Sequence, residues 1–174
     1  FFRHGIGYFR HREWLDAVRE RAVAAQPALE LHIRNHPRGY IAEFKSPSAA
    51  FLPPESARGH AWIVEAVRHA DSNHRSPVVV QLAATGDHGP FLRYFMLARH
   101  LANRGVTSVI LENPFYNSRA PFHQRGAKLA LVSDLADMGR ATVEEACGLL
   151  TFWHERGHER LAVAGVSQGG LHAA

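Results

Sequence analysis

The sequence predicts an α/β fold in which helices flank a mostly parallel sheet. Short apolar runs that suit buried strands alternate with longer segments of helical periodicity. Helices of that length between strands provide the right-handed crossovers of parallel sheets. The last apolar run leads into a G-x-S-x-G pattern at residues 165–169. At 174 residues, of which 46% are hydrophobic and 21% charged, the chain is long enough to bury one core.

Three helices are expected, because apolar side chains recur at helical spacing in three segments that end at a proline or a glycine. The middle helix opens at a proline, which favours the first turn. Its apolar side chains should form one face, made of Phe91, Tyr94, Phe95, Ala98 and Leu101. The three segments are residues 12–26, 90–104 and 133–156.

Five strands are expected between and around these helices. Residues 40–45 alternate between polar and apolar, whereas residues 61–68 fit either a strand or a short helix. Near them, the polar surroundings of His32 and His36 favour a loop. The remaining runs are almost wholly apolar, as is typical of strands buried in a parallel sheet. They are residues 78–83, 106–111 and 161–166.

The composition argues against several classes of protein. One cysteine, Cys147, excludes an intramolecular disulfide framework and favours a reducing compartment, either the cytoplasm or an organelle whose targeting peptide has been lost. The formal charge is +4, but arginines are interleaved with carboxylates, so nucleic acid is not an expected partner. No apolar run approaches the roughly 18 residues that a transmembrane segment needs.

Ser167 is the candidate nucleophile. It follows an apolar, β-compatible run, and the residues after Gln168 can open a helix. A strand-to-helix turn of this kind holds its serine in a strained backbone conformation and requires small neighbours. Gly165, Gly169 and Gly170 meet that requirement. The alternative is a glycine-rich turn with no catalytic role.

Two loops at strand ends carry the other candidate site residues, at 84–89 and 112–116. Acyl transfer needs two backbone N–H groups aimed at the developing oxyanion, one after the nucleophile and one from a neighbouring strand-end loop. We expect Gln168 to supply the first and Asp87 or Gly86 the second. Each loop by itself could be an ordinary turn. The side chains expected to line the substrate pocket are Thr85, His88, Glu112 and Tyr116.

Several short sequence motifs that follow one another along the chain strengthen this interpretation. A-T-G-D-H at 84–88, E-N-P-F-Y at 112–116 and G-V-S-Q-G-G at 165–170 resemble the α/β-hydrolase family typified by abhydrolase domain-containing protein 18. The similarity begins near residue 40. The resemblance implies an α/β-hydrolase fold, a serine nucleophile at Ser167 and the oxyanion donors named above. The sequence departs from the family pattern at Ala84, where glycine is usual, and at the two residues after Gly170.

We expect the chain to be the N-terminal portion of such a fold, truncated after the nucleophile elbow. An N-terminal helical and extended segment would span residues 1–39, and residues 40–174 would form the first part of a single hydrolase domain. The resemblance places the catalytic acid and the histidine base beyond Ala174. His88 is the best candidate base within the chain, although its loop is better suited to shaping the pocket. Alone, the fragment should be inactive and aggregation-prone, because a strand edge is left exposed.

The sequence thus predicts a serine hydrolase that cleaves a carboxylic ester or related acyl substrate, lipids included, without a cofactor. One alternative is a hydrolase-fold protein that binds or scaffolds without activity. A remote alternative is a zinc hydrolase, because His154 and His158 complete an H-E-x-x-H pattern. Both histidines would have to lie on one helix, whereas Gly157 is a good helix terminator.

Overall fold

A six-stranded sheet forms the centre of the protein in the computed structural model, which describes residues 25–67 and 75–174. The helix expected at residues 12–26 falls almost entirely outside the described residues. The strands are β1 (His32–His36), β2 (Gly39–Lys45), β3 (Arg58–Val64), β4 (Val78–Leu82), β5 (Thr107–Leu111) and β6 (Leu161–Gly165). The helices are α2 (Phe91–Arg93), α3 (Arg99–Ala102), α4 (Val132–Glu155) and α5 (Gln168–Ala173), with a π-helical turn, η2 (Tyr94–Ala98), and 3-10 turns η1 (Ala49–Phe51) and η3 (Asn117–Arg119).

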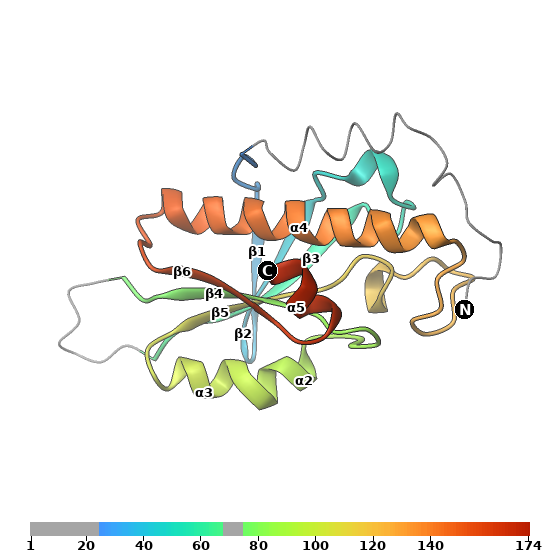
Figure 1. The fold of residues 1–174 in the computed structure, drawn as a ribbon. Coiled ribbons are helices and arrows are strands. Elements are labelled where there is room, and N and C mark those ends of the chain that lie inside the picture. Colours follow the sequence, from blue (N-terminus) through green and yellow to red (C-terminus); the bar gives the residue numbers. More distant parts are fainter. Residues whose placement is uncertain (1–24, 68–74) are drawn as a thin grey trace.

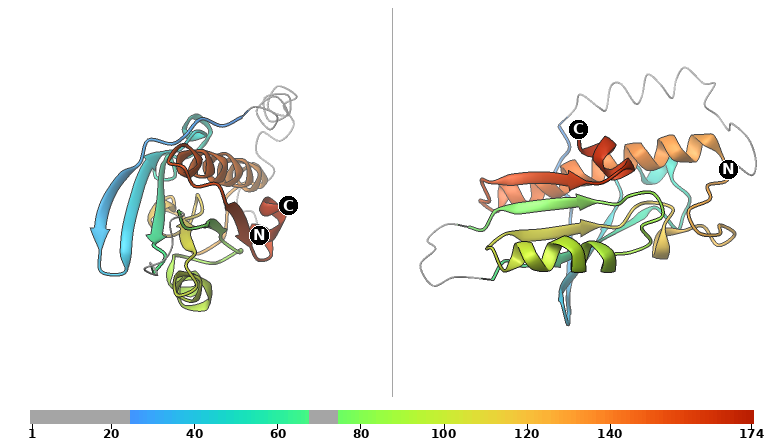
Figure 2. Two further views of the ribbon diagram at one scale, coloured as in Figure 1. Left: turned by 90° about the vertical axis from the view of Figure 1, so that its left-hand side faces the viewer. Right: turned by 60° about the horizontal axis from the view of Figure 1, so that its bottom comes forward.

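The sheet is mixed, with strand order β1-β2-β3-β5-β4-β6. The pairs β1–β2, β2–β3 and β3–β5 are antiparallel, whereas β4 pairs in parallel with both β5 and β6. More of the sheet is antiparallel than the sequence predicted, because β1, β2 and β3 follow one another without a crossover helix. Parallel pairing brings the carboxyl ends of β4, β5 and β6 to the same edge of the sheet (Figure 2).

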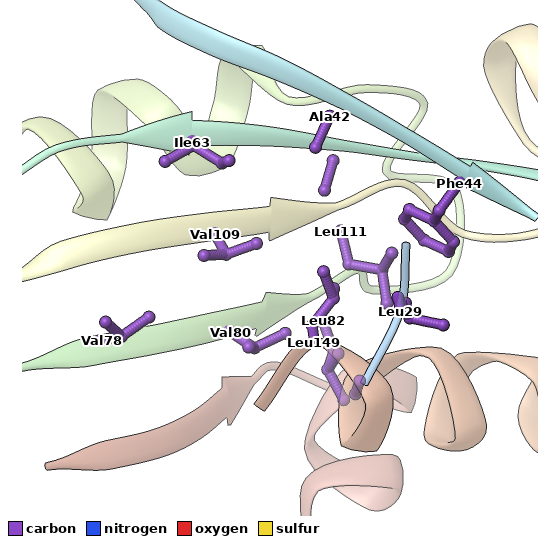
Figure 3. Packing of buried hydrophobic residues seen from close by; sticks show 12 residues of the cluster. Leu29, Ala42, Phe44, Ile63, Val78, Val80, Leu82, Val109, Leu111 and Leu149 are labelled. Atoms are coloured by element: carbon purple, nitrogen blue, oxygen red, sulfur yellow. The ribbon is translucent and has the colours of Figure 1, made fainter. Parts of the chain in front are cut away.

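Helices cover both faces of the parallel strands (Figure 1). On one face, Leu149 of α4 packs with Val80 and Leu111 (Figure 3). On the other, Ala98 and Ala102 pack against Ile110. Because successive strand residues point to opposite faces, both sets must be apolar. This explains the continuous apolar runs, and each fully buried leucine or valine contributes about 1.5–3 kcal/mol. None of the described helices is long and apolar enough to cross a membrane.

The prediction of a loop around His32 and His36 is wrong, because these residues form β1. His32 lies opposite Glu43 in the antiparallel hairpin with β2. Gly39 closes the hairpin turn with a φ of 130°. Most of β1 is exposed, so it shows no apolar alternation. Backbone pairing determines its structure instead. The ambiguous run that starts at Ala61 is a strand, and it begins earlier than expected, at Arg58.

The middle helix differs from the expectation in which side chains it buries. Of the side chains expected to form one face, Ala98 is buried, whereas Phe91 and Phe95 are 54% and 44% exposed. The helix also contains the π-helical turn η2, which changes the angular spacing of the side chains that follow. Small alanines at 98 and 102 bring the helix close to the sheet, and the aromatic rings remain outside.

The longest helix matches the expectation closely. α4 starts one residue before the expected position and ends one residue earlier. Gly157 ends the helix, as predicted. It has a φ of 81°, and its N–H donates to the His154 carbonyl at 2.8 Å. Met138 and Leu149 of the helix are buried. α4 runs along the parallel strands (Figure 1), and it connects β5 to the elbow strand β6.

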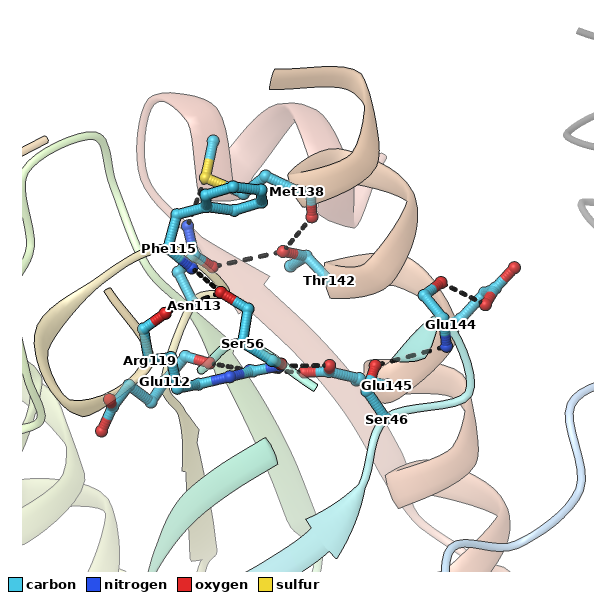
Figure 4. Close-up of polar contacts among 11 residues, drawn as sticks. Ser46, Ser56, Glu112, Asn113, Phe115, Arg119, Met138, Thr142, Glu144 and Glu145 are labelled. Atoms are coloured by element: carbon cyan, nitrogen blue, oxygen red, sulfur yellow. Dashed lines mark hydrogen bonds and ion pairs between the residues drawn. The ribbon is translucent and has the colours of Figure 1, made fainter. Parts of the chain in front are cut away.

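A buried ion pair joins α4 to the loop that follows β5 (Figure 4). Arg119 binds both carboxylate oxygens of Glu145, at 2.8 and 2.6 Å, and both side chains are wholly buried. The same guanidinium donates to the carbonyl oxygens of Glu112 and Ser56, at 2.6 and 2.8 Å. The Ser56 hydroxyl in turn donates to the Arg119 carbonyl at 2.6 Å. Three chain segments are thus joined at one guanidinium: α4, the segment before β3 and the loop after β5.

Removing one partner of this pair should strongly destabilise the fold. We expect Arg119→Met to lower the free energy of unfolding by about 3–5 kcal/mol, because it leaves the Glu145 carboxylate buried without its counter-charge. Arg34→Ala is the matched control, since its pair with Glu43 lies on the exposed hairpin, and it should cost at most about 1 kcal/mol. Urea unfolding of the two variants measures the difference. Equal losses would contradict this role for Arg119.

Candidate active site

Ser167 occupies the turn between β6 and α5, as predicted. Its φ is 55° and its ψ is −121°, a combination that side chains other than glycine rarely adopt. The Leu171 N–H donates to the Ser167 carbonyl at 3.0 Å, so the first turn of α5 begins at the serine. The Ser167 residue is exposed at the edge of the sheet. The predicted strand-to-helix turn is confirmed, while the nucleophilic role of the serine stays a prediction.

Two glycines allow this turn because other backbone atoms occupy the space of their missing side chains. A Cβ on Gly165 would lie 2.3 Å from the Gly169 carbonyl. A Cβ on Gly169 would lie 2.6 Å from the Leu82 carbonyl oxygen and 2.8 Å from that of Ala83. These contacts are shorter than any side chain tolerates. The glycines therefore bring the elbow directly against the end of β4.

The loop after β4 lies beside the elbow. The Thr85 hydroxyl donates to the Gln168 side-chain oxygen at 3.1 Å, which joins the loop to the residue after the candidate nucleophile. The close approach of Gly169 to Leu82 and Ala83 gives the same placement from the backbone. The expected proximity of the 84–89 loop to Ser167 is confirmed.

The two candidate N–H donors in this loop already have acceptors. The Asp87 N–H donates to the Ala84 carbonyl at 3.1 Å, within the loop's own turn. The Gly86 N–H donates to the Tyr116 hydroxyl at 3.3 Å, which is a long bond. The Gly86 φ is 80°, a conformation suited to glycine. An oxyanion would have to replace one of these acceptors, and the Gly86 bond is the weaker of the two.

Tyr116 and His88 connect the loops after β4 and β5. Tyr116 is 1% exposed, and burial raises the pKa of its phenol, so the hydroxyl is neutral at physiological pH. The His88 ring lies against the Tyr116 ring, with centroids 4.9 Å apart. Both His88 and Thr85 are exposed. These contacts bring the predicted pocket residues to one edge of the sheet, and their role in lining a pocket stays a prediction.

Glu112 has a local structural role. Its carboxylate accepts the Ser118 N–H at 3.0 Å, the Ser118 hydroxyl at 2.7 Å and the Asn117 amide at 3.4 Å. The Ser118 hydroxyl also contacts His60 Nδ1 at 2.7 Å, and burial lowers the pKa of that imidazole. Glu112 therefore stabilises the η3 turn beside the site. The contact with His60 joins segments 58 residues apart, which no local pattern indicates.

Arg93 was not anticipated from the sequence. It lies in a run of apolar residues at the end of α2, yet its side chain is only 11% exposed. Its Nε donates to the Asp87 carboxylate at 2.7 Å. Burial lowers the pKa of the guanidinium, and Asp87 opposes that shift. A single arginine among aromatic residues gives no sequence signal that distinguishes this arrangement from an exposed side chain.

The H-E-x-x-H pattern does not form one helical face. α4 ends at Glu155, and His154 is exposed. His158 lies beyond Gly157, where its Nδ1 contacts the Ser76 carbonyl at 2.8 Å. Within residues 25–67 and 75–174, no group of three or more His, Cys, Asp or Glu side chains is arranged to hold a metal ion. The two histidines therefore lack the arrangement that the zinc alternative requires.

Gly169 should be far less tolerant of substitution than its neighbour Gly170. We expect Gly169→Ala to lower the free energy of unfolding by about 1–3 kcal/mol, because its Cβ would meet the carbonyls of Leu82 and Ala83. Gly170→Ala is the matched control, since its Cβ would lie 3.3 Å from the Gly165 oxygen and alanine favours the helix by about 1 kcal/mol. Chemical unfolding distinguishes the two. The proposed close approach fails if Gly169→Ala is as stable as Gly170→Ala.

Comparisons with solved structures give the same fold. An acetyl xylan esterase from Paenibacillus sp. R4 aligns at a TM-score of 0.55 and 18% identity, over 93% of this chain and 54% of that one. One from Thermoanaerobacterium aligns at 0.54 and 18%, over 98% and 54%. A candidate acetyl xylan esterase from Bacteroides fragilis aligns at 0.59 and 13%, over 92% and 49%. The chain thus spans about half the length of these structures.

The family assignment rests on the sequence. The family described as alpha/beta hydrolase domain containing 18 matches residues 18–174. That match covers both strand-end loops and the complete elbow, and it agrees with the resemblance seen in the short sequence motifs. The chain belongs to the α/β-hydrolase domain containing 18 family.

Proposed function

We propose that the protein is a serine hydrolase that cleaves a carboxylic ester or a related acyl substrate, lipids included, through an acyl-enzyme on Ser167. The observation that carries this proposal is the strained Ser167 backbone at the turn from β6 to α5, beside the loop after β4. A serine in such a turn presents its hydroxyl at the edge of the sheet, clear of its neighbours. The family membership supports the same chemistry.

The reaction would begin with attack of Ser167 Oγ on the substrate carbonyl carbon, while a base takes the hydroxyl proton and later passes it to the leaving alkoxide. The carbonyl oxygen would gain negative charge, which the Gln168 N–H and an N–H of Gly86 or Asp87 would stabilise. Collapse of the tetrahedral intermediate would expel the alcohol and leave an ester on Ser167. Water would then attack this ester, release the carboxylic acid and restore the hydroxyl.

The second oxyanion donor requires an exchange of hydrogen bonds. We propose that the substrate oxygen displaces the Tyr116 hydroxyl from the Gly86 N–H, because that bond is long at 3.3 Å. The Asp87 N–H is held in a shorter bond of 3.1 Å to Ala84. A charged acceptor binds an N–H roughly twice as strongly as a neutral one, which favours the exchange as charge develops.

Ser167 needs a base, since an isolated serine hydroxyl is a weak nucleophile. We propose that the acid and the histidine follow Ala174 in the natural protein, in the chain order Ser, acid, His that this fold uses. Within the described residues, His88 lies against Tyr116 and is the first alternative to test. The pocket would be shaped by Thr85, His88, Glu112 and Tyr116 at the ends of β4 and β5.

Substitution of Ser167 tests the proposal. In the natural full-length protein, we expect Ser167→Ala to abolish labelling by a fluorophosphonate and to reduce ester turnover by about 10⁴-fold or more. Cys147→Ala is the control, because burial raises the pKa of that thiol and keeps it protonated. It should retain both labelling and turnover.

The outcomes distinguish an enzyme from a scaffold. Turnover that persists in Ser167→Ala would place the nucleophile elsewhere and contradict the mechanism. A natural protein that neither reacts with the fluorophosphonate nor hydrolyses a panel of esters would favour the hydrolase-fold scaffold instead.

A further inference from the structure

We propose that Arg93 is a positioning residue that fixes the loop at residues 84–89, and with it the second oxyanion donor, relative to Ser167. This inference rests on the proposed function and extends it to a residue that takes no part in the bond changes of the reaction. It is carried by three hydrogen bonds from one buried guanidinium to the ends of two neighbouring strands and to the loop between β4 and α2.

The three acceptors of Arg93 come from different parts of the site. Its Nε donates to the Asp87 carboxylate at 2.7 Å. Its Nη1 donates to the Gln81 carbonyl at 2.7 Å and to the Leu111 carbonyl at 2.8 Å. Gln81 lies near the end of β4, and Leu111 is the last residue of β5. The guanidinium therefore connects the loop to the sheet. The elbow packs against the same sheet.

The loop needs such a restraint because its own backbone is permissive. Gly86 and Gly89 have φ values of 80° and 131°, which are open to glycine alone at little cost. Inside the loop, the Asp87 N–H donates to Ala84 and the His88 N–H to the Gly86 carbonyl. These bonds hold the turn together but do not orient it relative to the sheet. The Asp87 carboxylate, held by Arg93, adds that orientation to the two weaker contacts of the loop, from Thr85 to Gln168 and from Gly86 to Tyr116.

The charges around Arg93 suit an anchor rather than a reactive group. The Arg93 and Asp87 side chains are 11% and 8% exposed, so their pair is little screened by solvent. Glu112 adds a second favourable charge, and together the two carboxylates oppose the effect of burial on the arginine. A guanidinium remains protonated under these conditions and presents donors in a fixed plane. A lysine could reach Asp87 but could not span both carbonyl groups in the same geometry.

The link to catalysis passes through the loop's contact with the elbow. The Thr85 hydroxyl donates to the Gln168 side chain at 3.1 Å, and Gly169 lies against the end of β4. A shift of the loop would therefore change the distance between the Gln168 N–H and the second donor. A displacement of about 1 Å in such a site can cost about 100-fold in rate.

The test compares substrate binding with binding of a transition-state mimic in the natural full-length protein. We expect Arg93→Lys to lower kcat by about tenfold to a hundredfold while KM stays within about threefold, because the donors act on the oxyanion and not on the ground state. The Ki of an alkyl boronic acid, which forms a tetrahedral adduct with a serine, should rise by the same factor as kcat/KM falls. Active sites are counted by fluorophosphonate titration, so that misfolded protein does not contribute.

Two further variants separate positioning from stability. Arg93→Ala opens a space for free guanidinium, and we expect millimolar guanidinium to restore part of its kcat. Arg140→Lys is the matched control, because Arg140 is also buried and paired, but its carboxylate partner Glu144 lies on the same helix and not in the loops of the site. It should lower the unfolding midpoint, leave the boronate Ki of the titrated sites within about threefold and show no rescue by guanidinium.

The failures of the two proposals are distinguishable. If wild-type turnover does not depend on Ser167, the proposed function fails first. If it does depend on Ser167, and titrated Arg93→Lys keeps the wild-type kcat and boronate Ki, the positioning role is refuted alone. A loss in Arg93→Lys that appears only as fewer titrated sites would likewise refute it, because it would show a structural role without an effect on the oxyanion donors.

Discussion

The approach of Gly169 to the carbonyls of Leu82 and Ala83 is the contact on which the site depends. Parallel pairing alone would place the ends of β4 and β6 side by side at the usual strand spacing. The missing side chains at Gly165 and Gly169 allow the elbow to fold back onto the end of β4. That contact places the Ser167 turn beside the loop after β4, and it provides a direct physical reason for the glycines around the serine.

Two buried arginines hold the remaining segments in place by the same chemistry. Arg119 joins α4 and η3 to carbonyls of two loops, and Arg93 joins the 84–89 loop to the ends of β4 and β5. Both guanidinium groups satisfy a carboxylate and two main-chain carbonyls. Buried main-chain carbonyls need hydrogen-bond donors, and one planar cation can bind several of them, from loops and from strand ends. The order of these loops therefore depends on side chains from other elements.

These long-range contacts mark the limit of what the sequence predicts. The apolar strands, α4 and the elbow were predictable because their signals lie within a few residues, as in the run before Ser167 and the glycine after α4. β1 was missed because pairing with β2 stabilises it while its side chains remain exposed. The burial of Arg93 and Arg119 was not predicted because it results from partners in other elements. The placement of Thr85 next to Gln168 followed from the strand-end rule, but the bonds of Gly86 and Asp87 did not.

Ser167 and the loop after β4 are proposed to form one catalytic unit. The most direct measurement is a crystal structure of the natural full-length protein inactivated by an alkyl fluorophosphonate, whose adduct mimics the tetrahedral intermediate. We expect phosphorus bonded to Ser167 Oγ, with the phosphoryl oxygen about 2.7–3.1 Å from the Gln168 nitrogen and from a main-chain nitrogen of the 84–89 loop. An adduct on another residue, or a phosphoryl oxygen directed away from that loop, would contradict this proposal.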